Sequence, residues 1–187
     1  MPILSGEASE DEGLLQAAKM MLVSARTAPK SGGIDDVLTA IVLGKEKESL
    51  ADEMDNIADQ RQIAGFKRDA KNLRDSAAAV IIGVRGTKSY GLNCGACGYS
   101  TCAQFDEAEK RKGLDFTGPN CVFKSLDLGI AIASAVKTAS ALDVDNRIMY
   151  RVGTAATRLN LLPEATVIMG IPISAKGKNI YFDRPAQ

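Results

Sequence analysis

The sequence contains no histidine, the side chain that most often acts as a general base or proton shuttle in enzymes. Acid–base chemistry in this chain would therefore have to come from carboxylates, lysine, tyrosine, cysteine or a bound cofactor. The chain also lacks an excess of positive charge, because Lys and Arg number 23 and Asp and Glu also number 23. A general nucleic-acid binder needs a clustered basic surface, so we expect no nucleic-acid partner.

Long apolar runs are absent as well. No stretch reaches the roughly 18–20 apolar residues that cross a bilayer, and we expect no membrane association. The acidic N-terminus, MPILSGEASEDEG, lacks the basic and apolar regions of a signal peptide, which favours a cytoplasmic location. Thiols stay reduced in the cytoplasm, so closely spaced cysteines there indicate metal binding or catalysis rather than disulfides.

Apolar residues along the chain predict alternating helices and strands. After a flexible lead over residues 1–10, helical spacing runs over 11–26, 45–61, 66–73, 125–142 and 146–160. A polar helix is predicted over 103–112. Short, apolar, β-branched runs at 37–43, 77–84 and 165–173 are typical of buried strands. With 187 residues, 45% of them hydrophobic, the sequence predicts an α/β (α+β) protein in which helices pack on a small sheet.

The periodicity stops at residues 85–102, RGTKSYGLNCGACGYSTC, which hold four glycines and three cysteines. Cys94, Cys97 and Cys102 are separated by two and then four residues, and Cys121 follows after eighteen more. Glycine follows each of the first two cysteines, and it allows the backbone to wrap a bulky cluster at φ values that other residues resist. We therefore expect an inserted cluster module over 85–124, within an α/β body made of 1–84 and 125–187.

Three kinds of site fit four cysteines in this arrangement: an iron–sulfur cluster, a structural zinc ion and a redox-active dithiol. Zinc sites usually pair two short Cys-x-x-Cys knuckles, whereas Cys121 stands alone. A thioredoxin-like dithiol needs neither Cys102 nor Cys121. An iron–sulfur cluster is favoured on these grounds. The spacing alone leaves the number of irons open, because plant-type two-iron ferredoxins use the same two gaps in reversed order.

The segment NCGACGYSTCAQF resembles the four-iron module Cys-x-x-Cys-Gly-x-x-x-Cys plus a later cysteine, which occurs in electron-transport ferredoxin subunits and corrinoid iron–sulfur proteins. The resemblance implies a 4Fe–4S cluster with Cys94, Cys97, Cys102 and Cys121 as its metal ligands. The whole chain is similar to a prokaryotic family of uncharacterised proteins that contain a ferredoxin domain. The segments that carry this similarity are SARTAPKSGGIDD, the cysteine loop, GPNCVFKSLDLGIAIASAVKTA and VIMGIPISAKGKNIYFDR. That family implies no established reaction.

Outside the module, the order of segments resembles the flavin-dependent nitroreductases. SARTAPKSGGIDDVLTAIVLGKEKESLADEM is similar to their turn, strand and helix, DLGIAIASAVKTASALDV to their central helix, and VIMGIPIS to their late strand. This resemblance implies a nitroreductase-like fold and FMN as a second cofactor. The flavin or phosphate contacts would then be Ser24, Arg26, Lys30 and Ser31, with Lys176, Lys178 and Arg184 as phosphate neutralisers. The Arg-Arg-Ser element that grips the FMN phosphate in that family is absent here. Nitroreductases are usually dimers with flavin at the interface, so a homodimer is a further expectation.

Taken together, the residues and the resemblances predict an iron–sulfur redox protein in which no single side chain is catalytic. One version is an FMN-dependent oxidoreductase that passes electrons between flavin and cluster, with a small-molecule electron acceptor. The second is a non-enzymatic electron-transfer protein or redox sensor that docks on a redox partner protein. The third is a zinc-stabilised structural protein.

Overall fold

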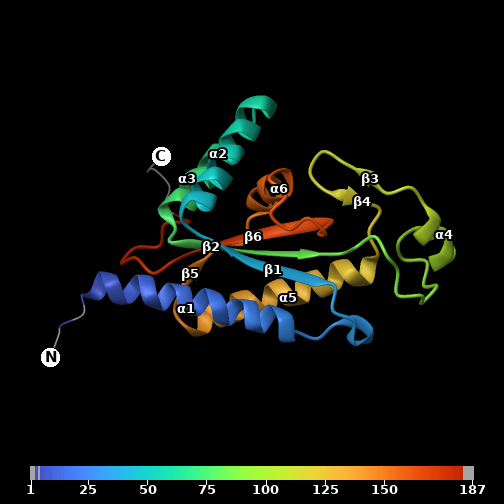
Figure 1. Ribbon diagram of the computed structural model, residues 1–187, viewed down its shortest axis with the longest axis horizontal. Coiled ribbons are helices and arrows are strands. Elements are labelled where there is room, and N and C mark those ends of the chain that lie inside the picture. The colour runs from blue at the N-terminus through green and yellow to red at the C-terminus, as the bar shows by residue number, and fades with distance from the viewer. Residues whose placement is uncertain (1–2, 4, 183–187) are drawn as a thin grey trace.

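A four-stranded antiparallel sheet lies at the centre of the protein, with helices on both faces (Figure 1). The structure is a computed structural model, which describes residue 3 and residues 5–182. The strand order is β1-β2-β6-β5, where β1 is Val37–Val42, β2 is Ala78–Val84, β6 is Val167–Ser174 and β5 is Asp145–Asn146. Each neighbouring pair runs antiparallel. The mixed α/β class predicted from the sequence is therefore confirmed.

Strand β2 divides the hydrophobic core into two clusters. It is buried at every position, as expected of a continuous apolar run between two layers. Val80 and Ile82 face the cluster built with helices α1 (Gly6–Thr27) and α5 (Val122–Ala141). Ile81 faces the cluster on the other side, where helices α2 (Gly44–Arg61), α3 (Ala64–Asp75) and α6 (Tyr150–Arg158) pack.

The structure corrects the predicted helix boundaries at three places. The helix predicted over residues 146–160 begins only at Tyr150, because Asp145–Asn146 form strand β5, which pairs with β6. Helix α1 begins at Gly6 rather than in the region of residue 11, because the Ser5 side chain caps it by accepting a hydrogen bond from the Ala8 amide at 3.2 Å. The flexible lead expected over residues 1–10 is thus wrong from Ser5 onward, and residues 1, 2 and 4 lie outside the described residues.

The helix predicted over residues 103–112 is wrong in its second half. Helix α4 spans Cys102–Glu107, and the chain then forms a two-stranded hairpin of β3 (Arg111–Lys112) and β4 (Thr117–Gly118). The Lys110 ammonium donates to the Phe105 carbonyl and so satisfies a carbonyl that a longer helix would have used. The hairpin closes through a 2.7 Å hydrogen bond from the Gly113 amide to the Phe116 carbonyl.

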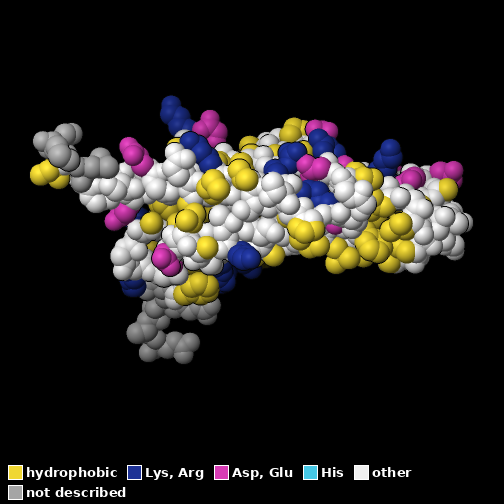
Figure 2. Space-filling model, turned by 90° about the horizontal axis from the view of Figure 1, so that it is seen from below, with side chains coloured by type: hydrophobic (Ala, Val, Ile, Leu, Met, Phe, Trp, Pro, Cys, Tyr) yellow, Lys and Arg dark blue, Asp and Glu magenta, His cyan; other side chains and the backbone are white. Residues whose placement is uncertain are grey.

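The cysteine-containing segment lies at one end of the molecule, beyond the end of β2 and beside the beginning of α5 (Figure 1). Hydrophobic side chains on the face made by α1 and α5 gather toward this end (Figure 2). Leu92 in the cysteine loop and Leu126 and Ile130 on α5 are 56%, 53% and 42% exposed. None of the helices in the described part of the chain is long and apolar enough to cross a membrane.

Candidate iron–sulfur centre

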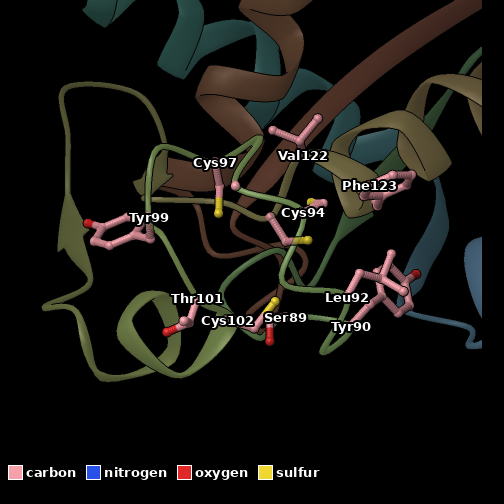
Figure 3. Close-up of a pocket in the computed structure, with 12 residues that line it drawn as sticks. Ser89, Tyr90, Leu92, Cys94, Cys97, Tyr99, Thr101, Cys102, Val122 and Phe123 are labelled. Carbon is pink, nitrogen blue, oxygen red and sulfur yellow. The ribbon is translucent and has the colours of Figure 1, made fainter.

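Four cysteines from separate parts of the module line one pocket. Cys94 and Cys97 lie in the glycine loop, Cys102 begins α4, and Cys121 directly precedes α5. Figure 3 shows the side chains of Cys94, Cys97 and Cys102 around a common space, with their sulfurs directed into it. The pocket contains about 330 Å³ not filled by protein atoms, part of it open to solvent. All four are free thiols, and their exposure falls from Cys94, which is exposed, to Cys121, which is buried.

The loop between Tyr90 and Thr101 curves around this pocket because several of its residues adopt positive φ. Gly95 and Gly98 have φ of 71° and 86°, so the conformations expected for these two glycines are observed. Gly91 has φ of 79°, and Asn93, one of the few residue types that tolerate this region, has φ of 48°. The Gly98 amide donates to the Gly95 carbonyl at 3.0 Å and closes the tight turn around Cys97.

Cys102 is held by reciprocal contacts with Asn93. The Asn93 amide donates to the Cys102 Sγ at 3.3 Å, and the Cys102 amide donates to the Asn93 Oδ1 at 2.8 Å. The first of these hydrogen bonds, followed by one from Ser89, lowers the pKa of the Cys102 thiol below its ordinary value. The thiolate is the form that binds metal, so the loop favours the ligating state of Cys102.

Cys121 is anchored to the sheet. Its amide donates to the Gly86 carbonyl at 2.8 Å, just past the end of β2. The preceding Asn120 donates to the Thr117 carbonyl at 2.6 Å and contacts the Thr166 hydroxyl at 2.5 Å. The Thr166 hydroxyl also accepts a hydrogen bond from the Gly86 amide at 2.9 Å. One buried ligand therefore belongs to the sheet and its edge, while the other three belong to the loop.

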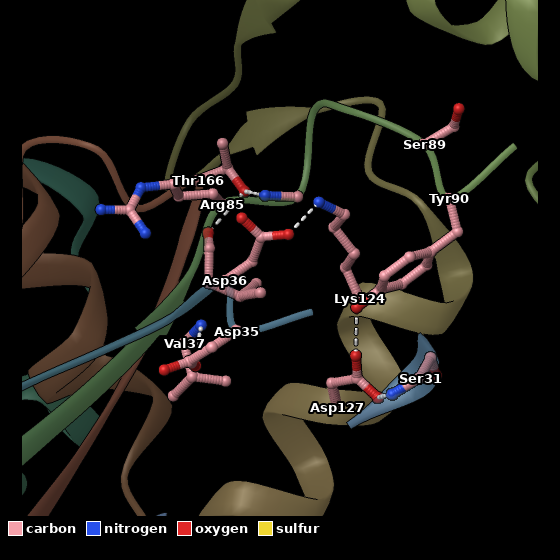
Figure 4. A network of polar contacts seen from close by, with 12 residues as sticks. Ser31, Asp35, Asp36, Val37, Arg85, Ser89, Tyr90, Lys124, Asp127 and Thr166 are labelled. Atoms are coloured by element: carbon pink, nitrogen blue, oxygen red, sulfur yellow. Dashed lines mark hydrogen bonds and ion pairs between the residues drawn. The ribbon is translucent and has the colours of Figure 1, made fainter. Parts of the chain in front are cut away.

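A polar network joins the loop to the body of the protein (Figure 4). The Tyr90 hydroxyl donates to the Asp127 Oδ2 at 2.5 Å. The other oxygen of Asp127 accepts hydrogen bonds from the amide and the hydroxyl of Ser31, both at 2.9 Å. Burial and the adjacent Asp127 carboxylate raise the pKa of Tyr90 well above its ordinary value. Asp127 thus ties together the cysteine loop, α5 and the short 3₁₀ turn η1 (Ser31–Gly33).

The thiols and the loop amides fit an iron–sulfur cluster. Four sulfurs supply the full ligand set of a four-iron cluster, and a loop N–H already points at one of them. Within the described residues, no three His, Cys, Asp or Glu side chains lie close enough to hold a single metal ion. The four cysteine side chains nevertheless line one pocket.

The residues predicted as flavin contacts near the end of α1 are engaged in local structure. Arg26 pairs with Asp35 at 2.6 Å. The Lys30 ammonium is buried and donates to the Arg26 and Ala28 carbonyls, at 2.5 and 3.0 Å, so that it caps α1. Ser31 binds Asp127, and Ser24 shares a 2.5 Å hydrogen bond with Thr138.

The basic residues predicted near the C-terminus lie elsewhere. Lys176 lines a different pocket, together with Glu7, Glu10 and Leu14 from the first half of α1. Roughly 20 Å of helix, at about 1.5 Å per residue, separates Leu14 from Arg26, so Lys176 and Arg26 do not surround one site within one chain. Lys178 follows on the exposed segment after β6, and Arg184 lies outside the described residues. The role of all these residues as flavin contacts stays a prediction.

Sequence reasoning missed the charged residues that support the site. Asp36, Lys124 and Asp127 were not predicted, although two of them carry a recognisable pattern. Lys124 and Asp127 stand three residues apart in the otherwise apolar first half of α5, and both are buried. A charged pair on the inner face of an apolar helix indicates specific partners, because unpaired buried charges are costly.

The solved structures that resemble this one include nitroreductases and an NADPH:FMN oxidoreductase. The nitroreductase CinD from Lactococcus lactis in complex with chloramphenicol matches with a TM-score of 0.59 and 12% identity, over 90% of this chain and 80% of that chain. The NADPH:FMN oxidoreductase from Vibrio harveyi complexed with NAD+ matches with a TM-score of 0.53 and 12% identity, over 96% of this chain. This chain spans only 63% of the Vibrio protein. The likeness confirms the nitroreductase-like fold, and at these identities it shows the fold alone.

The family comparisons concern the cysteine loop and the rest of the chain. A family model described as "Putative Fe-S cluster" matches residues 91–112, which include Cys94, Cys97 and Cys102. With the geometry above, this match defines the class: an iron–sulfur redox protein with a nitroreductase-like fold. A second model, described as "Uncharacterized protein containing a ferredoxin domain", matches residues 117–184. An "Uncharacterized protein" from Archaeoglobus fulgidus is 46% identical over 182 residues, which cover 97% of each chain. The chain belongs to this family of uncharacterised proteins containing a ferredoxin domain.

Proposed function

We propose that this protein transfers electrons through one 4Fe–4S cluster held by Cys94, Cys97, Cys102 and Cys121. The observation that carries the proposal is that these four thiols, and no disulfide, line one pocket. Such a cluster supplies one-electron transfer when bound. The residues of the chain hold it, donate hydrogen bonds to its sulfurs and, on the side of Cys121, keep water away.

Four irons rather than two are supported by the resemblance of the loop to the Cys-x-x-Cys-Gly-x-x-x-Cys module. The buried Cys121 brings the fourth ligand to the beginning of α5. Val122 and Phe123, in the first turn of α5, line the same pocket. Cys121 makes no side-chain capping contact, so its sulfur is free to act as a ligand.

The first test is the composition of the protein purified without oxygen. We expect about four irons and about four acid-labile sulfides per chain, and a broad visible band that dithionite bleaches. A colourless protein that holds one zinc and no sulfide would overturn the proposal and favour the zinc-stabilised structural protein.

The second test concerns the ligands. Cys121→Ser should lose most of the iron or convert the cluster to a form with fewer irons, seen by electron paramagnetic resonance. Ser100→Ala serves as the control, because it removes one oxygen atom from an exposed side chain in the same loop. This variant should keep the full iron content. A Cys121→Ser protein with the wild-type spectrum would remove Cys121 from the ligand set.

A second candidate function is an FMN-linked oxidoreductase, and the nitroreductase-like fold is the observation that favours it. The predicted flavin contacts Lys176 and Arg26 lie near opposite ends of α1 and do not surround one site within one chain. We therefore propose that flavin would bind only in a homodimer, and the exposed Leu126 and Ile130 on α5 offer an apolar face for it. Flavin fluorescence on titration with the protein, combined with sedimentation, tests both points. Unquenched fluorescence and a monomer would overturn this candidate.

The alternative to the FMN-linked enzyme, an electron carrier or redox sensor for a partner protein, differs from it in what reduces the cluster. If FMN binds, NAD(P)H with FMN should bleach the visible band of the cluster and a small-molecule acceptor should restore it. If the protein is a carrier, the same mixture leaves the cluster oxidised, and only a separate redox protein reduces it. The visible spectrum under the two conditions decides between them.

A further inference from the structure

A buried ion pair lies directly beside the cysteine pocket and has no part in holding the cluster. The Lys124 ammonium, on the first turn of α5, pairs with the Asp36 carboxylate just before β1 (Figure 4). The Lys124 side chain is 4% exposed and that of Asp36 is 18% exposed. Buried lysines are uncommon, because the ammonium loses its hydration.

Two contacts place this ammonium close to the pocket. Lys124 follows the ligand Cys121 by three residues, so it lies on the first turn after that ligand. Its Nζ lies 5.0 Å from the centre of the Tyr90 ring, and Tyr90 lines the cysteine pocket. The charge therefore lies against an aromatic ring that lines the same pocket as the four sulfurs.

We propose that Lys124 sets the reduction potential of the cluster, as a positioning residue whose fixed positive charge stabilises the reduced form. The proposal rests on the 4Fe–4S function proposed above. Reduction adds one electron from a low-potential one-electron donor and transfers no proton, so the cluster and its four thiolates gain one negative charge. A buried cation nearby lowers the free energy of that state, and low solvent exposure keeps the interaction from being screened.

The neighbouring carboxylates act in the opposite direction. Asp36 offsets part of the charge of Lys124, and Asp127 accepts a hydrogen bond from the Tyr90 hydroxyl. Lys124 and Asp36 therefore form a matched pair of charges whose separate removal should shift the potential in opposite directions. A purely structural role would not give shifts of opposite sign.

The experiment measures the midpoint potential of anaerobically purified protein by dye-mediated titration with dithionite, followed by the visible and electron paramagnetic resonance spectra. Lys124→Gln should lower the ratio of reduced to oxidised cluster at a fixed potential at least tenfold, or about 59 mV for one electron. Asp36→Asn should raise that ratio. The ratio of reduced to oxidised cluster should be lower in the double variant than in Asp36→Asn. This comparison isolates the effect of Lys124 even if Lys124→Gln alone does not fold.

Lys88→Gln is the matched control, because Lys88 is exposed in the same loop and the same charge is removed. The shift in midpoint potential caused by Lys88→Gln should be smaller than that caused by Lys124→Gln, and it should vanish in high salt. Equal potentials in Asp36→Asn and the double variant, or shifts of the same sign in both single variants, would overturn the role of Lys124. Iron and sulfide analysis of the wild type comes first: a wild type without a cluster refutes the proposed function itself, whereas a normal cluster with an unchanged potential refutes only this inference.

Discussion

At the scale of single residues, Gly86 lies where the chain leaves β2 for the cysteine loop. A Cβ atom at this position would stand 1.9 Å from the Asn120 Oδ1 and 2.8 Å from the Thr166 Oγ1. Both groups belong to the hydrogen-bonded contacts that hold the chain at Cys121. The Gly86 carbonyl also accepts a hydrogen bond from the Cys121 amide. The loop and the last cysteine therefore share one crowded contact that only glycine fits.

Gly86→Ala should destabilise the protein by about 1–3 kcal/mol, because the added methyl group forces Asn120 and Thr166 apart. Urea denaturation of the cluster-free protein measures the change. The iron content of the loaded variant should fall as well, because displacement of Asn120 moves Cys121.

Gly129→Ala provides the opposite control, since nothing lies within 4 Å of the position of its added Cβ. In the interior of helix α5 the alanine should stabilise the protein by about 0.5–1 kcal/mol. If both substitutions destabilised the protein equally, the contact at Gly86 would not explain its effect.

At the scale of elements, helix α5 links the cysteine loop to the rest of the protein through Asp127. Asp127→Ala would leave the Tyr90 hydroxyl and the Ser31 amide without their partner, at a cost of about 1–3 kcal/mol in the free energy of unfolding. It should also release iron to a chelator faster, because Tyr90 would no longer hold the loop.

Lys137→Ala, on the exposed face of the same helix, should leave both the stability and the release rate unchanged. Equal release rates in the two variants would show that this tie does not hold the loop.

The segment after β6 is attached through Tyr181, whose hydroxyl shares a 2.9 Å hydrogen bond with Ser76 at the end of α3. Burial raises the pKa of Tyr181 above its ordinary value of 10.0 in the folded protein. A raised pKa means that the stability contributed by the neutral phenol is complete below pH 10 and is lost as the pH rises beyond it. Above pH 10, the free energy of unfolding should fall with pH more steeply in the wild type than in Tyr181→Phe. The two slopes should differ by up to about 1.4 kcal/mol per pH unit. Urea denaturation across this pH range measures both slopes, and parallel curves would contradict the assignment.

Most elements of the fold were predictable because their apolar periodicity is strong. The strands predicted at 37–43, 77–84 and 165–173 lie within two residues of β1, β2 and β6. The order of the strands was not predictable, because β6 pairs with β2 across more than eighty residues of sequence. Nothing in the sequence of either strand indicates which strand it pairs with. The hairpin after α4 was missed for a similar reason, since Lys110 ends the helix through a contact that no periodicity reveals.

The candidate site was predictable only in its most local part. The spacing of the cysteines and the glycines beside them indicated a wrapped loop, and the structure brings the four thiols to one pocket. The surrounding charges depend on tertiary contacts. Lys124 on α5 pairs with Asp36 just before β1, and Asp127 on α5 binds Ser31 in η1. Sequence spacing could not show that these residues meet the cysteine loop.

At the scale of the whole molecule, the sheet and the cysteine loop are stabilised by different means. Strand β2 is hydrogen bonded on both sides and buried throughout. The stretch between Ser89 and Thr101 is mostly exposed and depends on isolated contacts such as those from Ser89 to Asp106, both at 2.8 Å. A cluster bound to all four cysteines would therefore order the loop much more than the sheet.

Removal of the cluster by chelation should accordingly loosen residues 87–101 and leave the sheet intact. Deuterium exchange should become faster throughout this loop, because metal binding supplies much of the free energy that orders a site of this kind. The amides of β2 and β6 should keep their protection, since the hydrophobic clusters on both faces of the sheet contain no cysteine. Cys121→Ser should reproduce the loosened loop without chelation. Loss of protection in β2 on iron removal would instead show that loop and sheet fold as one cooperative unit, and that the division into a module of residues 85–124 and a body is wrong.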